Sequence, residues 1–350
     1  MSNVTSRLSL LLPLALPVLL SACTENNINR SVAKESFQQA PSNLVDILWI
    51  IDNSSSMIQE QESVALGADA YASRLAEADV DLHLGVISTD LSQTNPYAGI
   101  LLGDPPVLTQ DTTDYVEYFK QRVQMGIGGD DAEKGLQAAL TALTPPLTQT
   151  LNVGFLREDA MLSIVIVSDE NDCSDDGRLN TEQGEDCYHN YDDLTPVPDL
   201  VERLLSLKAE ANRVTLSGII GPDIVDNCEY AVPGTRYSKA IAMLGGFEGD
   251  ICQADYGRMM DSLGTIAAGI YTSFALEHVP DPETIEVVVR APESEEVTVP
   301  EDGANGWTYN NDPTAPQIEF HGTAVPVRGS EITVTYTVAG AIQDAVDSGA

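Results

Sequence analysis

The chain has 350 residues, enough for one large domain or two modest ones, and 43% are hydrophobic, which excludes a wholly disordered protein. Against 17 lysines and arginines stand 54 aspartates and glutamates, for a formal charge of −37. Because phosphate contacts need clustered basic residues, this balance excludes a general nucleic-acid-binding protein and argues against attachment to anionic membranes through basic patches. The composition fits an exported protein that meets divalent cations.

Residues 1–22 have the pattern of a secretory signal, with an apolar run over 8–20 that is too short to span a bilayer. The stretch 20–23 (LSAC) resembles the lipobox of bacterial lipoproteins, which implies that Cys23 carries the lipid and becomes the first residue of the mature protein. By the same resemblance Thr24, which is not an aspartate, implies the outer membrane of a Gram-negative bacterium. The alternative is an ordinary signal peptide with an incidental cysteine.

Residues 23–42 are rich in Asn, Ser and Gln, which predicts a flexible tether. From residue 43 onward, apolar runs alternate with helix-like segments. Strands are expected over 46–51, 80–88, 162–167 and 214–220, and helices over 57–79, 132–143, 197–211 and 259–268. The alternation predicts an α/β fold over residues 43–276: a doubly wound, mostly parallel sheet with helices on both faces.

The pattern changes after residue 276. Period-two strands are expected over 284–290 and 332–338, with further candidates at Trp307 and 318–320, separated by turns rich in Pro, Gly and Asn. These features predict a small C-terminal antiparallel β domain over 277–340 and a loose tail over 341–350.

The remaining cysteines are four in number: Cys173, Cys187, Cys228 and Cys252. In an exported protein an even number of cysteines predicts disulfides. Of the three possible pairings we favour the sequential one, in which each bond closes a short loop and contributes roughly 3 kcal/mol by the chain-entropy model. A zinc site is the alternative, but CxxC-like spacing is absent.

Oxygen-bearing side chains follow two of the expected strands. The first strand runs into Asp52-x-Ser54-x-Ser56, and the third runs into Asp169. Because ligands of open parallel sheets bind at the carboxyl ends of the strands, these side chains are expected to meet at one edge. Carboxylates and hydroxyls are hard donors that suit Mg²⁺, or Mn²⁺ or Ca²⁺. The alternative is that Asp52 and Ser54 only cap the following helix.

This arrangement resembles the von Willebrand factor type A (vWA) domain and its metal-ion-dependent adhesion site (MIDAS), over roughly residues 43–276. The resemblance implies that the ion is held by three strand-end residues, with Asp169 acting directly or through water. These three residues are Asp52, Ser54 and Ser56. It also implies that a carboxylate from a partner fills the remaining coordination position.

The sequence departs from the family at one metal ligand. The family supplies a threonine from an intervening loop, and the corresponding stretch here, 128–136, contains none. Counting back from Gly135-Leu136, Asp130 falls in the position of the threonine, and Glu133 is a second candidate. The alternative is that both acids only complement the dipole of the following helix.

Residues 169–193 hold ten acids and one arginine, which predicts a solvated acidic loop. Asp172-x-Ser174-x-Asp176 imitates the start of a calcium-binding EF-hand loop, but Gln183 stands where a bidentate glutamate is required. Enzyme signatures are absent: the four histidines are scattered, and there is no HExxH, GxSxG or Walker motif.

We therefore expect a lipid-anchored protein of the cell envelope that is not an enzyme. It is expected to bind an unidentified protein or glycan through a divalent-metal site, in adhesion or another envelope interaction. Two alternatives stay open: a structural or assembly factor of the envelope in which the metal only stabilises the fold, and a metal-assisted hydrolase.

Overall fold

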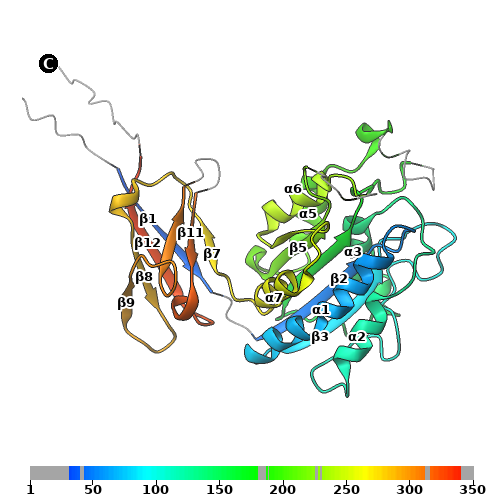
Figure 1. The fold of residues 1–350 in the computed structure, drawn as a ribbon, viewed down its shortest axis with the longest axis horizontal. Coiled ribbons are helices and arrows are strands. Elements are labelled where there is room, and N and C mark those ends of the chain that lie inside the picture. Colours follow the sequence, from blue (N-terminus) through cyan, green and yellow to red (C-terminus); the bar gives the residue numbers. More distant parts are fainter. Residues whose placement is uncertain are drawn as a thin grey trace, which may run out of the picture.

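A computed structural model describes residues 31–39, 43–179, 187, 189–224, 228, 231–311 and 316–339. The predicted signal, Cys23, the tail from residue 341 and Gln183 lie outside the described residues. The described chain forms two bodies that lie side by side, an α/β domain and a β domain (Figure 1). The coarse expectation of a mixed α/β protein with a separate antiparallel part is confirmed.

The α/β domain is built on a parallel sheet with the strand order β3-β2-β4-β5-β6. Strands β2, β4 and β5 are largely apolar runs, and every residue of β4 is buried, as expected for strands covered on both faces. The strands are β2 (Leu44–Ile51), β3 (Asp81–Ser88), β4 (Met161–Ser168), β5 (Val214–Ile220) and β6 (Glu248–Asp250). The interior strand β2 pairs in parallel with both β3 and β4, so its carboxyl end lies between theirs.

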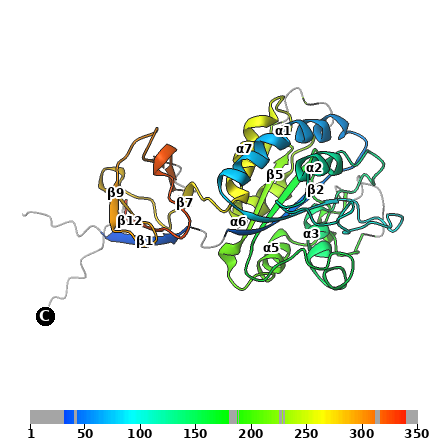
Figure 2. The same cartoon turned by 90° about the horizontal axis from the view of Figure 1, so that it is seen from below.

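Helices cover both faces of this sheet, in two groups of three (Figure 2). One face carries α1 (Ile58–Glu77), α2 (Tyr115–Val123) and α7 (Tyr256–Ala267), and the other carries α3 (Gly135–Leu143), α5 (Val197–Leu205) and α6 (Thr235–Leu244). Side chains at alternate positions of β2 point to opposite faces of the sheet. Trp49 packs on Tyr71 and Phe119 with ring centroids 5.1 Å apart in each pair, whereas Leu48 and Ile50 belong to the core under the second group.

Two of these helices, α2 and α6, were not expected from the sequence. The apolar positions of α2 are few, because its buried face includes Arg122, whose guanidinium donates to the carbonyl oxygen of Pro106 at 3.1 Å. The buried face of α6 likewise includes Arg236, which is paired with Asp172. A buried arginine interrupts the apolar periodicity that identifies a helix.

The β domain consists of two antiparallel sheets with the orders β1-β12-β8-β9 and β10-β11-β7. Their inward-facing residues form a core separate from those of the α/β domain, with Trp307, Phe320 and Tyr336 as its largest members. The strands are β1 (Val32–Gln38), β7 (Ser273–Ala275), β8 (Glu286–Arg290), β9 (Glu296–Val299), β10 (Trp307–Asn310), β11 (Gln317–Phe320) and β12 (Glu331–Thr337).

The prediction of a flexible tether over 23–42 is wrong for residues 32–38. This segment is strand β1, paired antiparallel along its length with β12, from Val32 opposite Thr337 to Gln38 opposite Glu331. Its inward positions are half-buried, and the ring of Phe37 lies 5.3 Å from that of Phe274. A polar composition hid the period-two pattern, and its partner strand comes about 300 residues later. The α/β domain is therefore inserted between β1 and the rest of the β domain.

The boundary between the domains also differs slightly from the expected one. Strand β7 pairs with β11, so Ser273–Ala275 belong to the β domain and not to the α/β domain. The junction is tied by side chains: Gln39 Nε2 donates to the carbonyl oxygens of Tyr271 and Pro326, each at 2.9 Å. Tyr271 in turn donates to the carbonyl oxygen of Asn212, just before β5, at 3.1 Å. The β domain thus contacts the amino-terminal edge of the parallel sheet.

A buried ion network holds that same amino-terminal edge. Asp46, in β2, is fully buried and accepts hydrogen bonds from the Arg157 amide and Nε, both at 2.7 Å. The ammonium of Lys208, also fully buried, lies 3.3 Å from the second Asp46 oxygen. Arg157 continues the network outward to Asp81 at 2.7 Å. Asp46 is thus the counter-charge of the buried Lys208 ammonium, whereas Arg157 is shared between Asp46 and Asp81.

We predict that Asp46→Ala lowers the free energy of unfolding by about 3–5 kcal/mol, because it leaves the Lys208 ammonium buried and uncompensated. Asp81→Ala is the matched control: its carboxylate is 45% exposed, so its loss should cost only about 0–1 kcal/mol. Urea denaturation of the two variants provides the measurement. Equal losses in both would contradict this account of the network.

Candidate metal centre

The predicted strand-end residues meet at the carboxyl edge of the sheet. Asp52 directly follows β2 and Asp169 directly follows β4. The Asp52 amide donates to the carbonyl oxygen of Val167 at 2.9 Å, which holds the two strand ends together. The hydroxyl of Ser56 lies 3.2 Å from Asp169 Oδ1. Residues more than 100 positions apart in the sequence thus share one site, at the opposite edge of the sheet from Asp46.

Asp52 organises the turn that carries the two serines. It is fully buried; Oδ1 accepts from the Ser54 amide at 2.7 Å and Oδ2 accepts from the Ser168 hydroxyl at 2.6 Å. The Ser54 and Ser56 hydroxyls lie 3.1 Å apart. Helix α1 begins later, after Met57, with no side-chain cap. Capping of α1 is therefore not what Asp52 and Ser54 do.

A third segment, 126–135, is held against this turn. Gln61 Nε2 donates to the carbonyl oxygens of Asp52 and Gly126, each at 2.9 Å, and so links the two loops. The Gly129 amide donates to the carbonyl oxygen of Asn53 at 2.8 Å. A Cβ atom on Gly129 would lie 2.4 Å from Asn53 Oδ1, so a larger residue here would displace the end of the Asn53 side chain.

The two candidates for the missing threonine differ in their surroundings. Asp130 is half-buried, and its Oδ1 accepts a hydrogen bond from the Ala132 amide at 2.9 Å. Glu133 is fully buried, and neither carboxylate oxygen meets a hydrogen-bond donor among the described residues. Helix α3 begins at Gly135 and has no acid in its first turn, so neither residue has the helical position of the dipole alternative. Glu133 therefore interacts with the carboxyl groups of Asp52 and Glu170 and meets no donor group or cation among the described residues.

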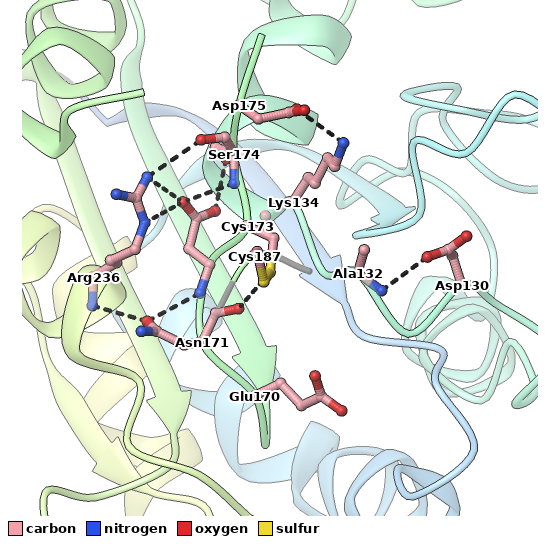
Figure 3. Close-up of a disulfide and its surroundings, with 12 residues drawn as sticks. Asp130, Ala132, Lys134, Glu170, Asn171, Cys173, Ser174, Asp175, Cys187 and Arg236 are labelled. Carbon is pink, nitrogen blue, oxygen red and sulfur yellow. Dashed lines mark hydrogen bonds and ion pairs between the residues drawn. A yellow bond between two sulfur atoms is a disulfide. The ribbon is translucent and has the colours of Figure 1, made fainter. Parts of the chain in front are cut away.

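Glu170 is a fourth acid in the site, which the sequence motif did not identify. It follows Asp169 at the end of β4, is half-buried, and lies close enough for its charge to raise the pKa of Glu133. Figure 3 shows its carboxylate apart from the ion pairs of the neighbouring loop. Its position next to a strand-end aspartate is the only signal in the sequence that could have indicated it.

These carboxylates share a consistent electrostatic shift. Burial, and then the charge of Asp52, raises the pKa of Asp169 to about 7. Burial is also the main cause that raises the pKa of Glu170 to about 7. Burial raises the pKa of Asp52, and burial, together with the charges of Asp52 and Glu170, raises that of Glu133. Each shift means that the charged form lacks a compensating cation.

Other buried acids nearby do have such cations. Asp172 pairs with Arg236 at 3.0 Å. Asp175 pairs with Lys134 at 2.8 Å (Figure 3). Asp172 also accepts from the Ser174 hydroxyl at 2.7 Å. Within the described part of the chain, no ion pair reaches the four acids of the strand-end cluster, which are Asp52, Glu133, Asp169 and Glu170. The EF-hand-like start at Asp172 is therefore committed to protein contacts, whereas the strand-end cluster is not.

The strand-end cluster fits a hard divalent cation by donor chemistry. Carboxylates and hydroxyls are the donors that Mg²⁺, Mn²⁺ and Ca²⁺ prefer, and the orphaned buried oxygens of Glu133 are groups that a cation would satisfy. No three His, Cys, Asp or Glu side chains among the described residues converge as a ready-made metal site. A cation here would therefore draw on the Ser54 and Ser56 hydroxyls together with the carboxylates.

Both predicted disulfide pairings are confirmed. Cys173 is bonded to Cys187 and Cys228 to Cys252. The first bond follows β4 (Figure 3), and the second joins the segment after β5 to the segment after β6. Both therefore cross-link loops at the edge that carries the strand-end cluster.

Comparisons with known proteins add little to this geometry. No protein-family model and no curated protein matches the chain. Two crystal structures of the pilus adhesin SpaC from Lactobacillus rhamnosus GG, one in the open conformation, are similar at TM-scores of 0.41 and 0.40 and identities of 9% and 10%. Each covers 88% of this chain but 41% of the adhesin, and likeness this weak carries no argument about function. Among the described residues, no helix has the length and apolar composition of a membrane span.

We predict that the cation-free protein loses stability as the pH rises from about 4 to about 7. The raised pKa values of Asp169 and Glu170, both about 7, make the folded state bind more protons than the unfolded chain in this window. The stabilisation is complete below the unfolded pKa values and is lost as the pH passes the folded ones. For each group the loss is about 1.4 kcal/mol for every pH unit that separates its folded pKa from its unfolded pKa.

Denaturant unfolding in EDTA at a series of pH values measures this slope. The double variant Asp169→Asn with Glu170→Gln is the control, because it removes both titrations and keeps the general self-repulsion of an acidic chain. The slope should be much smaller in the double variant. An identical slope in both proteins would show that these two acids do not cause it.

Proposed function

We propose that this protein is a lipid-anchored surface protein whose vWA-type domain binds a partner through a divalent cation. The carrying observation is Glu133: a fully buried carboxylate, with neither oxygen partnered among the described residues, beside Asp52 at the carboxyl edge of the sheet. Burying an ionised carboxylate without a partner is too costly for a stable fold, so the site calls for a cation or for protons.

Support for the vWA assignment comes from the fold and the position of the motif. A parallel sheet with helices on both faces carries Asp52, Ser54 and Ser56 after β2 and Asp169 after the adjacent central strand, β4. In the proposed site these residues and Glu133 hold the ion. The bound cation supplies a positive centre to which an oxygen of the partner can coordinate.

The proposed anchor agrees with the arrangement of the domains. The described chain begins next to β1 in the β domain, which contacts the amino-terminal edge of the parallel sheet. The strand-end cluster lies at the carboxyl edge, on the far side of the α/β domain. A lipid on Cys23 would therefore hold the β domain toward the membrane and leave the cation site directed away from it.

A structural or assembly role in the envelope is the second candidate function. One observation favours it: the cluster joins the ends of β2 and β4 to segment 126–135, so a cation there would also brace three loops. In that case removal of the cation should unfold the domain. In the ligand-binding case the domain should stay folded without it, and only binding should be lost.

Calorimetric titration of the purified protein with Mg²⁺, Mn²⁺ and Ca²⁺ tests the site. Asp52→Asn should abolish binding, and Glu133→Gln should weaken it by at least about tenfold, since each removes a carboxylate that hard cations prefer. Asp130→Asn, which alters the neighbouring acid in the same loop, should leave the affinity unchanged.

Circular dichroism of the same samples in EDTA separates the two functions. A native spectrum and a cooperative melt without cation support ligand binding, whereas unfolding supports the structural role. A wild-type protein that binds none of the three cations would refute the proposed site.

For the anchor, we predict that Cys23→Ser releases the protein in soluble form, because a chain without acyl groups has nothing to insert into the membrane. Detergent partitioning of envelope fractions provides the measurement. Unchanged partitioning of the variant would contradict the proposed lipidation.

A further inference from the structure

The strand-end cluster contains more negative charge than a divalent cation can neutralise. Asp52, Glu133, Asp169 and Glu170 are four carboxylates, against the two positive charges of the ion. The centre stays negative when no more than one of the four keeps a proton. An incoming carboxylate would then meet net repulsion in a partly buried site, where charges are poorly screened.

A cavity of about 380 Å³ opens beside the cluster, within the size range of small-ligand sites. Asp169 of the cluster and Ser56, whose hydroxyl lies 3.2 Å from it, both line this cavity. The rest of the wall comes from the first turns of α1, the segment after β5 and the stretch from β6 into α7. It includes the polar residues Gln59, Glu60, Ser63 and Gln253 beside apolar groups such as Ile251 and the Cys228–Cys252 disulfide. A ligand in the cavity would therefore be in reach of the cation.

Among the described residues, the wall of this cavity carries no lysine, arginine or histidine. Its polar groups are amides, hydroxyls and the carboxylates of Asp169 and Glu60, and Glu60 Oε2 is buried and meets no hydrogen-bond donor in the described part of the chain. An anionic ligand would find no counter-charge on this wall. What the wall lacks is a group that donates hydrogen bonds to Glu60.

The cation adds a second requirement. Hard cations accept only oxygen ligands, and an ammonium or guanidinium group has no lone pair to offer. The ligand must therefore bring a neutral oxygen to the ion and donated hydrogen bonds to the carboxylates. A hydroxyl does both, because it donates one hydrogen bond and has lone pairs for coordination.

We infer that the ligand of this site is a neutral glycan, whose hydroxyls coordinate the cation and donate to Glu60. This inference rests on the proposed cation site and replaces the acidic partner that the family resemblance implies. It is based on the excess negative charge of the cluster and on the amide, hydroxyl and carboxylate groups in the cavity wall.

Binding to an array of immobilised saccharides tests the inference, with neutral, sialylated and sulfated members and with peptides that carry one glutamate or one lysine. At saturating Mg²⁺ or Ca²⁺ the protein should bind at least one neutral saccharide, and EDTA should abolish this binding. Glu60→Gln should weaken it by about tenfold or more, the loss of one charged hydrogen bond. Glu62→Gln, an exposed acid on the same helix, should have no effect.

A charge-reducing variant supplies the reverse test. Glu133→Thr removes one negative charge from the cluster and should increase binding of the glutamate peptide by at least about tenfold at saturating cation. Calorimetry on each variant shows whether the cation is bound at the concentrations used. The affinity for the cation itself should change little in Glu60→Gln.

The possible outcomes separate this inference from the proposed function. Absence of cation binding in the titration refutes the proposed site, and the inference with it. Cation binding together with preference for the glutamate peptide, with binding of the lysine peptide, or with no neutral saccharide bound refutes the glycan inference alone.

Discussion

A buried aspartate lies near each end of strand β2, Asp46 at the amino-terminal end and Asp52 just after the carboxyl end. The two differ in whether the protein supplies a cationic partner. At the amino-terminal edge, Asp46 is compensated by Arg157 and Lys208, so the network is complete within the chain. At the carboxyl edge, Asp52 meets hydroxyls, an amide and further carboxylates. The ion network at Asp46 is complete without a ligand, whereas the carboxylates around Asp52 need a cation or protons from solution.

Because the α/β domain is inserted between β1 and β7, the carboxyl edge of its sheet is directed away from the β domain. Both chain connections to the β domain leave from the amino-terminal side of the parallel sheet, where Tyr271 reaches Asn212. The ends of β2, β4, β5 and β6 all point away from those connections. An inserted domain is tied at two points, so its outer edge is presented in a more fixed orientation than a single linker would allow.

The sequence predicted those features whose physical cause is local in the chain. Continuous apolar runs predicted β2 and β4, and a loop-closing argument predicted the two disulfides. It did not predict features that depend on contacts with distant parts of the chain. Ala33 and Phe37 alternate correctly for a strand, yet only pairing with β12 explains why that polar segment folds. The sequence could not decide between Glu133 and Asp130. The structure shows that Glu133, just before α3 begins at Gly135, is the fully buried one.

The disulfides explain how an edge with this much negative charge keeps its shape. Cys173–Cys187 fastens the loop that follows β4, and Cys228–Cys252 joins the segments after β5 and β6 and forms one wall of the cavity. Loops that carry like charges repel one another, and a covalent link opposes that repulsion without adding a positive group. A positive group would neutralise the cluster from within and remove its need for a cation. Covalent bracing is therefore the solution that keeps both the cavity and the charge that the proposed function requires.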